Sequence, residues 1–183
     1  MHWFPFALFL VAWVVAALSW LYGVAEFIGV WRFWPWAYRQ GLCVVTSTLP
    51  ESLARPANSS IELAEVKARA DSAGDWVFRA PSPWLGLRLR TPFPIKGRLE
   101  WSGSTPRITG RLPVGTVGFF GAWMVGWAMG AWFAPHGRIQ ALWLALIGWG
   151  FAAALMALSL PLELRRFRKA QGALVEYLKG AVR

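Results

Sequence analysis

Three long stretches of the chain lack aspartate, glutamate, lysine and arginine: Trp3 to Ala25, Leu112 to Gly137 and Ile139 to Leu162. A helix needs roughly 20 apolar residues to cross the ~30 Å hydrocarbon layer of a membrane, and a helical backbone satisfies its own hydrogen bonds there. Several of the 14 tryptophans follow the first stretch, at residues 31–36, which is typical of a helix that leaves a bilayer. The pattern therefore predicts three transmembrane helices, at residues 3–31, 113–134 and 139–161.

The polar segment between the first two of these stretches, residues 40–111, has the pattern of short strands and turns. Leu42 to Thr48 is rich in β-branched residues. Asp71 to Asp75 contains turn-forming residues, which predicts a hairpin. Apolar and polar side chains alternate in three further segments: Leu85 to Arg90, Ile95 to Trp101 and Arg107 to Leu112. We expect five or six short strands in a small sheet or a partly open barrel.

Residues 61–70 fit two different structures. Ser59-Ser-Ile-Glu62 resembles a helical capping box, and the residues that follow have high helix propensity. A strand at the same place would instead supply the partner that the turn at Asp71 to Asp75 requires. We favour the strand and leave the helix as the alternative.

The distribution of charge predicts an orientation. The chain has 19 lysines and arginines against 9 acidic residues, a net charge of +10. Every one of these cations except Arg138 lies between the first two apolar stretches or after the third. Loops enriched in lysine and arginine stay on the cytoplasmic side. We therefore expect a protein of the bacterial inner (plasma) membrane, with its N-terminus outside and its β-rich domain and C-terminus in the cytoplasm.

The same distribution argues against nucleic acid as a partner. Basic residues beside a cytoplasmic leaflet are satisfied by anionic lipid, and no nucleic-acid-binding motif or basic stripe is visible in the chain.

The segment after Pro161, residues 163–183, alternates apolar and basic side chains at helical spacing. This pattern predicts an amphipathic helix that lies on the cytoplasmic membrane surface. Docking of this helix on a partner or on the β-rich domain is the alternative. Its candidate contacts to anionic lipid are Arg165, Arg166, Arg168 and Lys169.

Small residues recur every fourth position in the second apolar stretch: Gly118, Ala122, Gly126, Gly130 and Ala134. Residues four apart share one helix face, and small side chains let two helices approach closely in a membrane. We expect this face to pack against the third transmembrane helix. A dimer face, or a binding face for a membrane partner, is the alternative.

Glu26 is the acidic residue within the predicted transmembrane helices. Ionisable groups inside a membrane are costly and are candidates for function. Glu26 also lies only a few residues before Arg32, close to the expected membrane boundary. We therefore expect it to be hydrated or paired with a nearby arginine, and a role in transport is the alternative.

Arg90, Phe93, Gly97 and Gly110 precede the second apolar stretch. In this arrangement the segment resembles uncharacterised bacterial membrane proteins in which a small β domain, with an R-x-x-F-x-P-x-x-x-G element, precedes two membrane helices. The proline spacing differs, because Pro92 and Pro94 flank Phe93. The domain is also similar to pleckstrin-homology-like domains tethered by membrane helices. The resemblance implies an architecture and no activity.

The chain offers few groups for catalysis. Acid–base and nucleophilic catalysis need matched groups within hydrogen-bond reach. His2 and His136 are expected outside the membrane, whereas Cys43 and most serines are expected inside. We therefore predict a protein that is not an enzyme, with no catalytic residues, no cofactor and no metal site.

The predicted fold class is an α + β membrane protein. A small β-rich cytoplasmic domain lies between transmembrane helices 1 and 2, and an amphipathic helix ends the chain. The function expected is that of an accessory or scaffold subunit that binds other membrane proteins or a second copy of itself. The alternative is a membrane-tethered module that binds anionic lipid headgroups. A third expectation, an oligomeric channel or transporter component, rests on Glu26.

Overall fold

The computed structural model describes residues 3–49, 53, 59–81, 94–101, 105–133 and 138–180. Within these residues the protein is α + β, with four helices and one six-stranded antiparallel sheet. The helices are α1 (Trp3–Trp31), α2 (Pro35–Arg39), α3 (Val114–Phe133) and α4 (Arg138–Gly180). The strands are β1 (Leu42–Thr48), β2 (Ser60–Glu62), β3 (Lys67–Ala70), β4 (Trp76–Arg79), β5 (Lys96–Glu100) and β6 (Arg107–Leu112).

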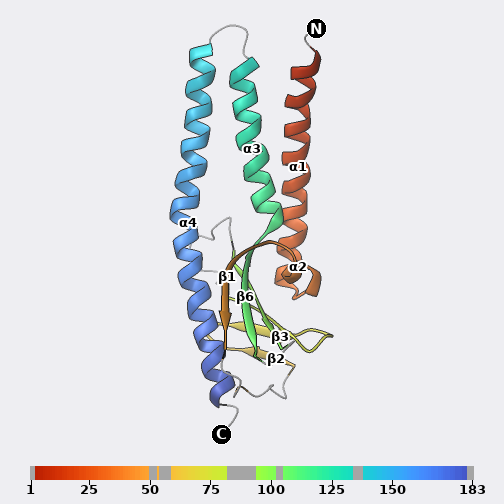
Figure 1. Cartoon of the computed structure of the whole chain (residues 1–183), viewed down its shortest axis with the longest axis vertical. Coiled ribbons are helices and arrows are strands. Elements are labelled where there is room, and N and C mark those ends of the chain that lie inside the picture. The colour runs from red at the N-terminus through yellow and green to blue at the C-terminus, as the bar shows by residue number, and fades with distance from the viewer. Residues whose placement is uncertain are drawn as a thin grey trace.

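The long helices α1, α3 and α4 stand side by side at one end of the molecule, with α3 in the middle (Figure 1). Each is long and apolar enough to cross a membrane, over Phe6–Trp31, Val114–Trp132 and Leu142–Gly180. The prediction of three long apolar helices is confirmed. At the other end the sheet lies against the second half of α4 (Figure 1).

The strands form a sheet with the order β1-β6-β5-β4-β3-β2, in which all described pairs are antiparallel. The expected hairpin is present, because β3 and β4 pair across the turn at Asp71 to Asp75. That turn is closed by hydrogen bonds from the Asp71 and Gly74 amides to the Asp75 and Asp71 carbonyls, at 2.7 and 3.0 Å. The strand expected at Leu85 to Arg90 lies outside the described residues.

Residues 61–70 form strands, but two of them. The Leu63 amide donates to the Val66 carbonyl at 2.8 Å, and this tight turn separates β2 from β3. The expected single strand is corrected to a second hairpin. The turn also places Val66 in the core, where it is completely buried.

The sheet lies between the second and third helices of the chain, not between the first and second as expected, because the short helix α2 precedes it. The chain reverses after α1 through Phe33, whose φ is 58°. The Trp34 amide donates to the Gly29 carbonyl and the Phe33 amide to the Val30 carbonyl. This is a Schellman-type helix end with phenylalanine at the position that usually holds glycine. Five residues are too few to show a helical period, so α2 was not expected.

α4 is one helix of 43 residues that continues through Pro161. The expected separate amphipathic helix on the membrane surface is therefore wrong, and the alternative, docking on the β-rich domain, is found. The apolar stripe of the second half of α4 is buried against the sheet: Phe167, Ala170, Leu174 and Leu178. Phe167 stacks on Phe78 with ring centroids 5.5 Å apart. This burial explains why the stripe faces the sheet and not lipid.

Candidate functional site at the junction of the long helices and the sheet

α1 packs on α3 through a stripe of small residues. Ala12, Ala16, Ser19 and Gly23 recur at alternating spacings of four and three, and Ala12 and Ala16 are buried. The closest approach is at Gly23, where a Cβ atom added to Gly115 of α3 would lie 2.2 Å from the Gly23 Cα. The two backbones are therefore in direct contact, as small residues allow in membrane helices.

The predicted glycine face of α3 also turns toward α1, not toward α4 as expected. A Cβ at Gly118 would lie 2.9 Å from the Ser19 Oγ, and Gly126 and Gly130 face the rings of Trp13 and Phe9. The physical reason is that α1 carries the matching stripe of small residues. Ala122 is half-buried, and Ala134 lies outside the described residues.

The contact between α3 and α4 uses larger groups. The Trp127 ring of α3 covers Gly148 of α4. The Trp149 indole of α4 donates to the Met124 carbonyl at 3.1 Å. Gly148 of α4 thus meets an aromatic ring of α3 instead of its glycine face.

Glu26 lies at the end of the α1 stripe and is completely buried. Its carboxylate forms an ion pair with Lys96 of β5. The other oxygen, Oε2, accepts the Gly115 amide hydrogen bond at 3.0 Å. An acceptor is favourable there, because the first amides of α3 have no partner within the helix and carry its positive dipole end. The expectation of a hydrated Glu26, or one paired with an arginine, is corrected: Glu26 is completely buried, and β5 supplies a lysine as its partner.

Lys96 is also completely buried. Its ammonium donates to both Glu26 and the Ala37 carbonyl of α2. Burial lowers the pKa of Lys96, and Arg111 lowers it too, while Glu26 acts in the opposite direction. We call the set Glu26, Lys96, Gly115 and Ala37 the junction, because it joins α1, α2, α3 and β5 in one hydrogen-bonded group.

Cations lie side by side on the face of the sheet that carries Lys96. Arg111 of β6 is opposite Lys96, and Lys67 of β3 is opposite Arg79 of β4. The Arg79 guanidinium lies 4.2 Å from the Trp31 ring centroid and 5.0 Å from that of Phe33. Nη2 of Arg79 also contacts the carbonyl of Trp31, the last residue of α1, at 3.5 Å. The negative end of the α1 dipole and the π faces therefore stabilise this charge.

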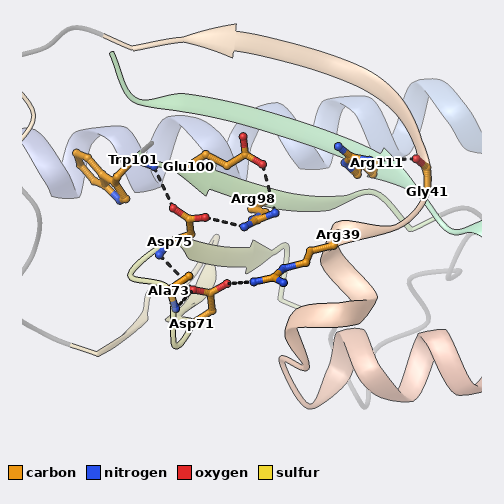
Figure 2. Close-up of polar contacts among 9 residues, drawn as sticks. All are labelled: Arg39, Gly41, Asp71, Ala73, Asp75, Arg98, Glu100, Trp101 and Arg111. Carbon is orange, nitrogen blue, oxygen red and sulfur yellow. Dashed lines mark hydrogen bonds and ion pairs between the residues drawn. The ribbon is translucent and has the colours of Figure 1, made fainter. Parts of the chain in front are cut away.

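Farther along the same face the charges neutralise one another (Figure 2). Arg98 lies between Asp75, at 2.6 Å, and Glu100, at 3.4 Å. Asp75 also accepts the Trp101 amide at 3.1 Å, and Asp71 lies 3.7 Å from Arg39. These contacts hold the β3–β4 turn on β5 and leave little net charge there for an anionic ligand.

A pocket of about 320 Å³ lies next to the junction, between α1 and α3. Most of its surface is apolar, and the glycines of the closest helix approach contribute to it. Its lining residues are Trp20, Gly23, Val24, Phe27, Gly115, Thr116, Phe119 and Phe120.

The predicted lipid contacts on α4 lie outside its sheet-facing stripe. Arg165, Arg168 and Lys169 are exposed, and Arg166 is half-buried and pairs with Glu163 at 2.7 Å.

Cys43 is exposed and free. Among the described residues, no group of three histidine, cysteine or acidic side chains could hold a metal ion.

The sequence reasoning singled out Glu26 but missed its partners, Lys96 and Gly115. One signal was available: Glu26 continues the spacing Ala12, Ala16, Ser19, Gly23, which places it on the packed face of α1. No local pattern marks Lys96, because its partner is 70 residues away.

Comparison of the chain with protein-family models, with curated proteins and with solved structures found no match.

Proposed function

We propose that the chain is a non-catalytic inner-membrane protein, an accessory or scaffold subunit that holds its sheet at the cytoplasmic surface and binds other membrane proteins. The observation that carries this proposal is the junction. Glu26 and Lys96 are completely buried and connect two long helices to the middle of the sheet. A buried ion pair costs desolvation and is weak evidence for stability. The Glu26–Lys96 pair matters here because it fixes the position of the sheet relative to the helices.

Two further connections support a rigid arrangement. α4 runs without interruption from the long-helix layer to the sheet, where Leu174 and Leu178 are completely buried. On the opposite face, Val77 of β4 packs with Val30, Ala37 and Tyr38 at the end of α1 and in α2. The sheet is therefore held from both faces, and a rigid display of one surface suits a protein that positions others.

The row of three long helices leaves broad apolar faces for partners. α4 exposes large apolar side chains at intervals of four residues: Ile139, Trp143, Ile147 and Phe151, each more than 60% exposed. Lipid alone can cover such a face, but a helix of a partner can cover it equally well.

Site-specific photo-crosslinking in native bacterial membranes tests the proposal. A photoreactive residue replaces Trp143 or Ile147 on the outer face of α4, and Leu21 on the exposed face of α1. Ala145, which is buried in the helix layer, is the matched control. We expect the same membrane protein to be crosslinked from both neighbouring α4 positions, and not from Ala145. Adducts to lipid alone at all the outer positions would contradict a scaffold role.

A second candidate function, binding of anionic lipid headgroups, is favoured by the exposure of Arg165, Arg168 and Lys169 just after the uncharged stretch that ends at Leu162. Each cation near an anionic surface contributes about 1 kcal/mol. Changing all three to glutamine in the full chain is expected to abolish a preference for phosphatidylglycerol over phosphatidylcholine, measured by native mass spectrometry. Glu176→Gln, at an exposed position of the same helix, is the control. An unchanged preference would count against this function.

A further inference from the structure

The pocket between α1 and α3 has a backbone floor and aromatic walls. Gly23 and Gly115 lie where the two helices touch, so no side chain fills the space beside them. Trp20 and Phe27 of α1 stand on one side, and Phe119 and Phe120 of α3 on the other. A volume of about 320 Å³ is at the lower end of the range for ligand pockets.

The pocket opens on the outer surface of the helix layer. Trp20, Val24 and Phe27 are 56%, 40% and 39% exposed although they line it. All three belong to a helix long and apolar enough to cross a membrane. Once the helices are in a bilayer, as the proposed function requires, the molecules that reach this surface are lipids. Water would find few polar partners in such a site.

The pocket is too small to enclose a whole helix. A helix with its side chains is at least ~10 Å wide, so about 4 Å of its length would already fill this volume, less than one turn. One flexible hydrocarbon chain, or one inserted side chain, is the right scale.

The charges near the pocket decide which part of a lipid binds. None of the lining residues is a cation. Glu26 already occupies the amide of Gly115 at the start of α3, so this helix end does not offer that amide to a phosphate. The pocket is therefore suited to hydrocarbon, and a headgroup would lie outside it.

We propose that this pocket binds one acyl chain of a membrane phospholipid, held between the aromatic side chains of α1 and α3 and in contact with the backbone of the junction. The inference rests on the membrane insertion that the proposed function includes. It adds a lipid site of defined chemistry at a place distinct from the exposed cations of α4.

The test uses the full chain in phosphatidylcholine vesicles that contain a phospholipid with a photoreactive group in its acyl chain. Labelled residues are mapped by mass spectrometry. We expect labelling of Trp20, Phe27 and Phe119 to exceed severalfold that of Val14 and Leu18, which are at least as exposed on α1 as Trp20. A photoreactive free fatty acid is used in a parallel arm. Labelling by the fatty acid and not by the phospholipid would overturn the assignment to phospholipid.

A matched pair of variants tests whether the pocket itself is responsible. Val24→Trp adds bulk at the exposed wall of the pocket, whereas Val14→Trp makes the same change on exposed α1 surface away from it. We expect Val24→Trp to reduce labelling of Phe119 severalfold and Val14→Trp to leave it unchanged. Native mass spectrometry of the two variants in detergent should show a lost lipid adduct only for Val24→Trp.

Three further outcomes would overturn the inference. If labelling simply follows side-chain exposure along α1 and Val24→Trp does not change it, the pocket is not a lipid site. Membrane insertion would still stand in that case. Crosslinked dimers joined at the pocket would assign it to a second copy of the chain. An absence of lipid labelling anywhere on α1 would contradict insertion, and the proposed function would fail with it.

Discussion

At the scale of single residues, the most consequential feature is the pair of opposite charges with no access to solvent. Glu26 and Lys96 are each surrounded by helix and sheet, and each has a second hydrogen-bond partner on the main chain. Such a pair contributes little net stability as a whole, but each member is costly to leave alone. Replacing one member of the pair is therefore expected to affect stability differently from replacing both.

Glu26→Gln is expected to destabilise the protein by about 3–5 kcal/mol, because it leaves the Lys96 ammonium buried without a counter-charge. Lys96→Met should cost a similar amount for the converse reason. The double variant should recover most of the loss, since no unpaired charge remains. Denaturant unfolding in mild detergent measures all four proteins. Additive losses in the double variant would show that the two groups do not depend on each other.

Because of Tyr38, we expect the protein to lose stability at alkaline pH. Its hydroxyl is buried and donates to the Val30 carbonyl at 2.9 Å, and burial raises the pKa of Tyr38 above its ordinary value of 10.0. The unfolded chain then releases this proton more readily than the folded one, so stability is expected to fall as the pH rises above 10. Tyr38→Phe should lower stability at neutral pH by about 0.5–1.5 kcal/mol, since the Val30 carbonyl loses one hydrogen bond but keeps the one from the Phe33 amide.

The control for this prediction is the pH dependence of the variant. Tyr38→Phe should lose less stability than the unmodified protein between pH 9 and pH 11, followed by thermal unfolding. Parallel curves for the two proteins would mean that Tyr38 does not contribute to the alkaline transition.

At the scale of elements, the long helices and most strands could be predicted from local patterns. Runs without charge marked α1 and α3, and alternation marked β5 and β6. The pairing of faces could not be predicted, because a stripe such as Gly118 to Gly130 shows that a helix packs closely but does not say against which neighbour. The site depended on contacts between distant parts of the chain, so Glu26 was visible and Lys96 was not.

Pro161 shows a related limit. Proline removes an amide and usually ends or bends a helix, so the sequence indicated a break before the basic segment. α4 continues because its two halves are each held by tertiary packing, on α3 and on the sheet. Tertiary contacts outweigh a local preference of this size.

Gly115→Ala is expected to weaken the contact between α1 and α3. The added methyl group would lie 2.2 Å from the Gly23 Cα, so the backbones must separate, and overpacking of this kind costs about 1–3 kcal/mol or more. Gly121→Ala is the matched control on the same helix, since a Cβ there meets nothing within 4 Å. Thermal unfolding in detergent should separate the two variants clearly. Equal stability would show that the helices are not in close contact at this glycine.

At the scale of the whole molecule, the sheet lies at one end of the helix layer and the first residues of α1 at the other (Figure 1). Basic residues gather at the sheet end, with Arg39, Arg69, Arg107 and Lys169 all exposed there. This polarity supports the proposal that the sheet lies in the cytoplasm.

Cys43, the one cysteine in the sequence, is exposed on β1 and provides a direct test of this placement. A membrane-impermeant maleimide should label it in inside-out vesicles and leave it unlabelled in intact spheroplasts. Cys43→Ser supplies the blank for both preparations. Labelling from the outside of intact spheroplasts would reverse the orientation, and with it the lipid contacts assigned to Arg165 and Lys169.

The uninterrupted α4 has a mechanical consequence. Its 43 residues span about 65 Å, so its upper half lies beside α3 and its lower half against the sheet as one stiff rod. Transmembrane helices tilt when the bilayer becomes thinner or thicker. Because Phe167 and Leu174 are anchored in the sheet, such a tilt would swing the whole sheet, so that a change in membrane thickness becomes a movement of the sheet.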